Sequence, residues 1–120
     1  MPNRDATPSA ASSRPLSEIK AELFKALAHP ARIRALEILS GSECSVGELQ
    51  PLVGIELSHL SQQLSVLRRA GLVSSRKEGA SVIYSIRNDN VVELLRVAKE
   101  LLISSLAETT GLLSDLRAAR

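Results

Sequence analysis

The feature that most constrains the fold of this chain is a pair of short helical segments between residues 45 and 70. Ser45 and Glu48 have the spacing of a capping box, which predicts a helix that ends at Gly54. A second helix is predicted over residues 56–70, with leucines recurring on one face that we expect to be buried. The leucines of that face are Leu57, Leu60, Leu64 and Leu67. Two short helices joined by a tight turn are typical of a helix-turn-helix.

A β-hairpin is predicted directly after the second helix. Its strands are expected over residues 72–76 and 82–86, and the loop between them contains Gly79. The other helices are predicted over residues 16–27, 30–40 and about 89–115. The resulting fold is mainly α with a small β-hairpin, in the order α-α-α-α-β-β-α. This order predicts a winged helix-turn-helix.

The length of 120 residues favours a single domain preceded by a tail. Residues 1–15 hold three prolines among mostly Ser, Ala and Thr, so we expect a disordered tail there and one folded domain over residues 16–118. With one Phe, one Tyr and no Trp in the chain, the core is expected to be aliphatic.

Several classes of protein are excluded by composition and pattern. One cysteine cannot form an intrachain disulfide or a cysteine-based zinc site. No apolar run approaches the roughly 18 residues of a membrane span, and no secretory signal begins the chain, so a cytoplasmic protein without a membrane partner is expected. We find no paired-carboxylate, phosphate-loop or nucleophile–base signature, so neither an enzyme nor a cofactor is predicted.

The basic residues are unevenly placed along the chain. The net charge of +2 hides a basic stretch over residues 56–87, where Glu56 and Glu78 are the only acids. Such a footprint indicates a polyanionic partner. RNA and single-strand binders stack bases on aromatic side chains, which are scarce here, so double-stranded DNA is favoured.

The polar face of the helix at 56–70 carries the candidate DNA contacts. Its members are Ser58, His59, Ser61, Gln62, Gln63, Ser65, Arg68 and Arg69. Residues near the beginning of the helix suit base edges, and Gln62 can pair bidentately with adenine. Arg68 and Arg69 suit phosphates, as do Arg76 and Lys77 in the hairpin. The alternatives are an ordinary solvated helix face and a hairpin whose charges protect its edges.

The last predicted helix is too apolar for a helix that buries only one stripe. The surplus, together with the helix at 16–27, predicts a two-fold homodimer, the alternative being burial in a larger monomeric core. The candidate dimerisation residues are Leu16, Ile19, Leu23, Leu94, Ala98, Leu101, Leu102 and Leu106.

Residues 16–106 resemble the ArsR/SmtB family of bacterial winged-helix repressors. The resemblance is carried by the segments LFKALAHPARIRALEILS and SVGELQPLVGIELSHLSQQLSVLRRAGLV, and by a hairpin that passes through Gly79 and Tyr84. It implies a homodimer paired through its first and last helices, which binds a pseudo-palindromic operator and releases it on an inducing signal.

Many members of that family sense metals at two sites, and neither ligand set is present here. The thiolate site of the short helix corresponds to Ser45, Val46, Gly47 and Glu48. The interfacial site of the last helix corresponds to Asn88, Asn90, Leu101 and Ser104. We therefore expect no metal site, and the sequence does not identify a small-molecule inducer.

These observations predict a sequence-specific, homodimeric repressor that does not sense metal through the usual sites. One alternative is a winged-helix module that binds proteins and has no operator of its own. Another is a redox-responsive repressor that acts through Cys44, because a thiolate just before a helix N-terminus is stabilised by the helix dipole. His29 is interpreted as a helix-boundary residue.

Overall fold

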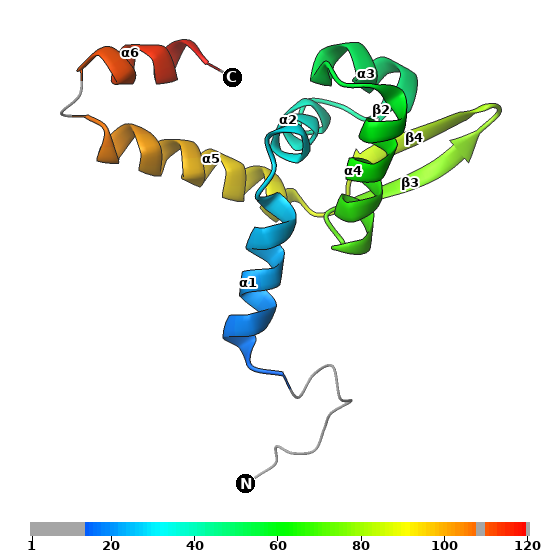
Figure 1. Cartoon of the computed structure of the whole chain (residues 1–120), viewed down its shortest axis with the longest axis horizontal. Coiled ribbons are helices and arrows are strands. Elements are labelled where there is room, and N and C mark those ends of the chain that lie inside the picture. The colour runs from blue at the N-terminus through cyan, green and yellow to red at the C-terminus, as the bar shows by residue number, and fades with distance from the viewer. Residues whose placement is uncertain (1–13, 108–109, 120) are drawn as a thin grey trace, which may run out of the picture.

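A computed structural model of the chain describes residues 14–107 and 110–119 (Figure 1). Its elements are α1 (Leu16–Leu27), α2 (Pro30–Leu39), β2 (Cys44–Ser45), α3 (Val46–Val53), α4 (Leu57–Arg69), β3 (Val73–Glu78), β4 (Ser81–Ile86), α5 (Asp89–Ser105) and α6 (Thr110–Ala118). The predicted mainly helical fold with a winged helix-turn-helix is confirmed. Of the tail predicted over residues 1–15, all but Arg14 and Pro15 lies outside the described residues. No helix in the described part has the length and apolar character to cross a membrane.

The helix starts follow local signals in the sequence. Ser45 Oγ accepts from the amide of Glu48 (3.1 Å), and Glu48 Oε1 accepts from the amide of Ser45 (2.8 Å), which completes the predicted capping box of α3. Asn88 caps α5 through its Oδ1, which accepts from the amide of Asn90 (2.8 Å). Because side chains satisfy these free amides, α3 and α5 begin where the sequence predicts.

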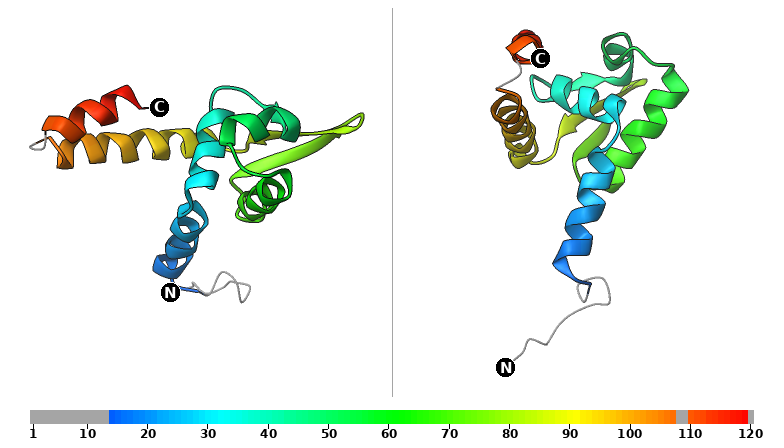
Figure 2. Two further views of the ribbon diagram at one scale, coloured as in Figure 1. Left: turned by 45° about the horizontal axis from the view of Figure 1, so that its top comes forward. Right: turned by 60° about the vertical axis from the view of Figure 1, so that its left-hand side comes forward.

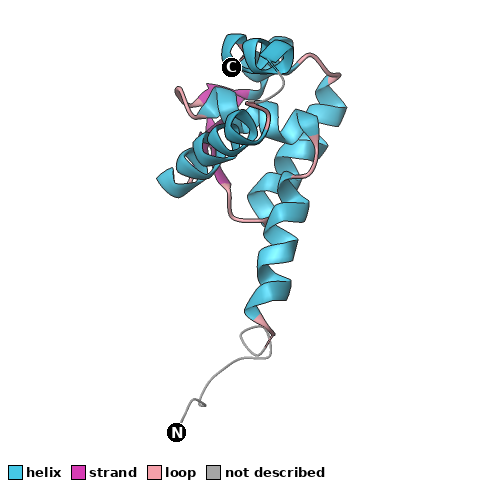
Figure 3. Cartoon of the chain, turned by 90° about the vertical axis from the view of Figure 1, so that its left-hand side faces the viewer, coloured by secondary structure: helices cyan, strands magenta, loops and turns pink. Residues whose placement is uncertain are grey.

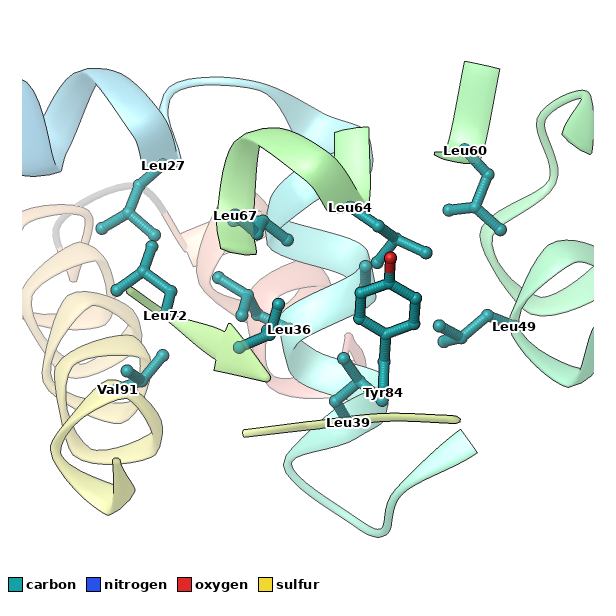
Figure 4. Packing of buried hydrophobic residues seen from close by; sticks show 12 residues of the cluster. Leu27, Leu36, Leu39, Leu49, Leu60, Leu64, Leu67, Leu72, Tyr84 and Val91 are labelled. Atoms are coloured by element: carbon teal, nitrogen blue, oxygen red, sulfur yellow. The ribbon is translucent and has the colours of Figure 1, made fainter. Parts of the chain in front are cut away.

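The core is aliphatic, as expected from the composition. Fully buried leucines of α2, α3 and α4 pack together with Val73 of β3, and Tyr84 of β4 lies among them (Figure 4). The leucines with no exposed surface are Leu36, Leu49, Leu60, Leu64 and Leu67. This packing joins α2, the helix-turn-helix and the sheet in one core and thereby fixes the orientation of α4.

The hairpin differs from the prediction in the length of its loop. β3 and β4 pair antiparallel from Val73 with Ile86 to Glu78 with Ser81, so only two residues connect the strands, where five were predicted. Gly79 adopts a φ of 63°, which a two-residue hairpin turn requires and glycine permits. The short strand β2 was not predicted; its two residues pair with β4 and are too few to form an alternating pattern.

The prediction of a single last helix that reaches about residue 115 is also wrong. The structure has two helices there, α5 and α6, and α5 ends at Ser105. Ser104, Ser105, Thr110 and Gly111 stand around the break and are weak helix formers, so continuation of the helix is not favoured.

Helices α1 and α5 extend away from the core in different directions (Figures 1 and 2). Figure 3 shows how far α1 projects from the body of the molecule, and Figure 2 shows α6 turning back alongside α5. The radius of gyration is 17.4 Å, larger than the roughly 13 Å of a compact chain of this size. Phe24 of α1 is 54% exposed and lies outside the core. The projecting helices thus leave apolar surface uncovered.

Candidate nucleic-acid interface

Helices α3 and α4 form the helix-turn-helix, and the turn between them depends on Gly54. This residue adopts a φ of 84°, in the left-handed region that glycine reaches without strain. Leu60, Leu64 and Leu67 then anchor one side of α4 in the core, so the opposite side of the helix faces solvent.

The predicted DNA contacts of α4 lie on or beside that outward side. The exposed members are Ser58, His59, Ser61, Gln62, Arg68 and Arg69, and the half-buried members are Gln63 and Ser65. The structure therefore presents hydroxyl, imidazole and amide groups on the first turns of α4 and two arginines on its last turn.

The sequence predicts that Leu57 belongs to the buried face of α4, but the structure shows that it does not. It is the first residue of α4 and is 50% exposed, because the core begins one turn further along the helix at Leu60. Leu57 instead lines a groove of about 360 Å³ between α3, the first turn of α4 and the tip of the hairpin.

This groove brings Ser61, a predicted DNA contact, together with Gln50 and Ser81, which the sequence analysis did not select. Its wall includes Gln50 of α3, Ser61 of α4 and Ser81 of β4. Ser81 is the first residue of β4 after the hairpin turn. Prediction of the two-residue turn, in place of a five-residue loop, would have placed Ser81 at the tip of the hairpin, beside α4. The groove joins the outward face of α4 to the wing, the hairpin of β3 and β4, and its lining is mixed, with Leu57 and Val82 beside the polar side chains.

The wing carries two cations that the sequence predicts to contact DNA, Arg76 and Lys77. Arg76 is exposed and forms two hydrogen bonds to the carboxylate of Glu43, both 2.8 Å, and further ones to Glu78. These hydrogen bonds raise the pKa of Arg76, and the bond to Glu43 has a larger effect than the bond to Glu78. The guanidinium in turn lowers the pKa of Glu43. Lys77 is exposed on the same strand. Arg76 thus links the wing to the loop that precedes β2.

His29 and His59, far apart in sequence, lie together at the edge of this surface. Their rings meet edge to face with centroids 6.0 Å apart. Nδ1 of His29 accepts from the amide of Ala31 (3.0 Å), so His29 is the N-cap of α2, in agreement with its interpretation as a helix-boundary residue. A capping residue of α2 therefore contacts the recognition helix.

Comparison with known proteins gives the same assignment as the geometry. Residues 29–75 match the family described as bacterial regulatory protein, arsR family. An uncharacterized HTH-type transcriptional regulator of Mycobacterium tuberculosis, Rv0081, is 54% identical over 107 residues, which are 88% of this chain and 94% of the relative. The chain belongs to the arsR family of bacterial regulatory proteins.

Solved structures of similar proteins agree with this membership. The crystal structure of Rv0081 superimposes on this arsR-family protein with a TM-score of 0.75 at 53% identity, covering 81% of this chain and 98% of that one. A homodimeric winged helix-turn-helix DNA-binding domain, Mb0332 of Mycobacterium bovis, gives 0.72 at 28% identity (87% and 95%). The transcriptional repressor BigR of Xylella fastidiosa gives 0.67 at 31% identity (78% and 96%).

In this arsR-family protein, the described residues bring no three His, Cys, Asp or Glu side chains together in a group that could hold a metal ion. At the position of the thiolate site, the carboxylate of Glu48 is engaged in the capping box. The residues at the interfacial site positions are amide, apolar and hydroxyl side chains of the segment 88–104.

Cys44 has a different environment from the one proposed for a reactive thiolate. It is half-buried in β2, and its Sγ donates to the backbone oxygen of Ser42 at 3.6 Å. Burial raises the pKa of the thiol, and the carboxylates of Glu48 and Glu43 raise it further. These contributions to the pKa oppose the expected stabilisation of the thiolate by the α3 dipole and disfavour the redox alternative.

The candidate dimerisation residues fall into two groups. Leu16, Ile19, Ala98, Leu101 and Leu102 are exposed, whereas Leu23, Leu94 and Leu106 are half-buried. Two apolar residues missed by the sequence analysis, Phe24 and Val97, are 54% and 46% exposed. Apart from Leu52 of α3 and Leu57 of α4, the exposed large apolar side chains thus lie along α1 and α5.

Proposed function

We propose that this protein is a cytoplasmic, sequence-specific repressor that binds double-stranded DNA as a homodimer on a pseudo-palindromic operator. The observation that carries the proposal is the outward face of α4, which is polar and unobstructed while three buried leucines hold the helix rigidly. A rigid helix of this kind fits the major groove, with the wing beside it.

Exposed apolar side chains on α1 and α5 support the homodimer. Leu16 and Leu101 are each more than 60% exposed, and such surface on a small chain favours a partner. The relative Mb0332, of similar fold, is described as homodimeric. A two-fold dimer presents its two α4 helices to successive major grooves, so the operator half-sites are expected about 34–36 Å apart.

The residues of the interface take different roles in this proposal. Ser58, His59, Ser61 and Gln62 read base edges, whereas Arg68, Arg69 and Lys77 contact phosphates. Arg76 contacts a phosphate only when it gives up its hydrogen bonds to Glu43. Leu57 offers an exposed apolar side chain that can contact the methyl group of a thymine.

The proposal is tested by measuring binding to DNA from the protein's own promoter and to a random duplex over a salt series. We expect affinity for the promoter at least about 10³-fold higher than for the random duplex, and a steep fall of both affinities with salt. Weak binding without preference or salt dependence would instead support a winged-helix module that binds proteins.

A further inference from the structure

A second apolar surface of α5 lies beside α2 and α6 and stays partly open to solvent. The three helices enclose a groove of about 370 Å³, within the range of small-molecule sites. Its apolar lining comes from Ile33 of α2, Leu95, Ala98 and Leu102 of α5, and Leu116 of α6. Figure 2 shows α6 lying along α5, where it forms one wall of the groove.

The groove carries one ammonium group at its rim. Lys99 Nζ donates to the backbone oxygen of Ala119 at 3.1 Å, and within the described ranges no carboxylate lies within 4.0 Å of it. The other charged residue of the lining, Glu37 of α2, has a counter-ion of its own, Arg34, at 3.8 Å. Of the two charged side chains that line the groove, Lys99 is therefore the one without an ion-pair partner among the described residues.

We propose that this groove binds a small molecule with an apolar body and a carboxylate. The body lies against Leu95, Leu102 and Leu116, and the carboxylate accepts from Lys99 Nζ in place of, or together with, the oxygen of Ala119. A charge-assisted hydrogen bond to a carboxylate is stronger than the bond to a neutral carbonyl, so the ammonium favours the anion.

The groove overlaps the surface assigned to the second copy of the chain only at Ala98 and Leu102. Val97 and Leu101 lie four residues apart on one face of α5, whereas Leu95, Lys99 and Leu102 follow the neighbouring face. Ala98 and Leu102 stand at the border of the two. A ligand therefore contacts both the edge of the dimer surface and α2, whose Leu36 packs in the core with the leucines of α4.

This position makes the ligand an effector: its binding changes how the two α4 helices are held and so changes operator affinity. This regulatory consequence rests on the proposed function, but the binding itself does not. Binding is therefore measured first without DNA.

The test is calorimetric titration of the full chain with octanoate, below its micelle concentration, with octanol and octylamine as matched probes. We expect one octanoate per chain, about tenfold weaker binding of octanol, and no binding of octylamine. Lys99→Gln keeps a donor for the Ala119 oxygen and removes the charge, and should weaken octanoate about tenfold. Lys20→Gln, on the exposed side of α1, should change nothing.

The proposal is overturned if octanoate does not bind, or if Lys99→Gln binds it as tightly as the unmodified chain. It is also overturned if Leu116→Ala converts a dimer into a monomer, because a second copy would then occupy the groove. If the chain binds octanoate but shows no preference for an operator, the proposed ligand site stands and the proposed function is rejected.

Discussion

At the scale of single residues, the interface contains side chains that differ in how far their polar groups are already engaged. Gln62 is exposed on α4 and faces solvent, whereas Arg76 is bound by two carboxylates within the same chain. A free amide can be used directly to read a base, while a paired guanidinium must first exchange partners. Exposure and charge therefore do not by themselves rank the contributions of these residues to binding.

Gln62→Ala is expected to relax the choice of base at one operator position, at a cost of roughly 1–3 kcal/mol, because a bidentate contact to a base edge is lost. Competition binding against operators changed one base pair at a time measures this effect. Ser17→Ala on α1 is the matched control. Unchanged affinity and unchanged base preference in Gln62→Ala would contradict the assignment of α4 as the reading helix.

Glu43→Gln is expected to raise affinity for all DNA sequences alike. The change removes a negative charge and weakens the hold on Arg76, which then reaches a phosphate, so the slope of log affinity against log salt steepens by about 0.9. Glu93→Gln breaks a comparable pair with Arg96 on α5 and controls for net charge. Equal slopes in the two variants would show that Arg76 does not gain a phosphate contact.

Cys44 is expected to react slowly with iodoacetamide at neutral pH. Burial, Glu48 and Glu43 raise its pKa, so the thiolate forms only at a higher pH than in a free thiol, and the alkylation rate rises there. Mass spectrometry of the labelled chain over a pH series, with glutathione as reference, gives the two inflection points. An inflection below that of glutathione would restore the redox interpretation.

At the scale of elements, helix starts follow from two or three neighbouring residues. The capping box of α3 and the Asn88 cap of α5 involve residues no more than three positions apart, so sequence reading locates them. The hairpin turn and the end of α5 were placed wrongly, because both depend on small differences in pairing and propensity. β2 exists only because β4 is next to it.

His29 gives a test of one such helix start. His29→Ala should lower the free energy of unfolding by about 1 kcal/mol, because the amide of Ala31 loses its acceptor. His29→Asn should recover most of this loss, since asparagine is a good N-cap although it has no ring to contact His59. Denaturant unfolding of both variants measures the difference. Equal destabilisation would assign the effect to the ring contact instead.

At the scale of the whole molecule, two helices leave the body of the chain with apolar side chains exposed. Burying Leu16 and Ile19 of α1 and Val97 and Leu101 of α5 against a second copy would remove this surface from water. The extended shape of the single chain, with its large radius of gyration, agrees with a protomer that completes its packing by association.

If the proposed homodimer forms through α5, Leu101→Glu is expected to convert it into a monomer, because two carboxylates would be buried across the two-fold axis. Leu101 is 64% exposed in the single chain, so its replacement should leave the fold and the helical circular dichroism unchanged. Analytical sedimentation measures the mass of the protein in solution. Operator affinity should fall when the mass falls from that of a dimer to that of a monomer. Ser114→Glu on α6 is the control, and a Leu101→Glu variant that remains dimeric would contradict the dimer surface.

The sequence alone determined the features that depend on near neighbours and on periodicity: the helix-turn-helix and its capping box, the wing, the leucines that bury one side of α4, and the family resemblance. Only the tertiary structure decided which side chains meet across the fold. It showed Arg76 held by Glu43, thirty-three positions away, His29 against His59, Cys44 half-buried near two carboxylates, and the groove between α2, α5 and α6. Such pairings depend on how the helices pack in three dimensions, which local patterns of residues do not encode.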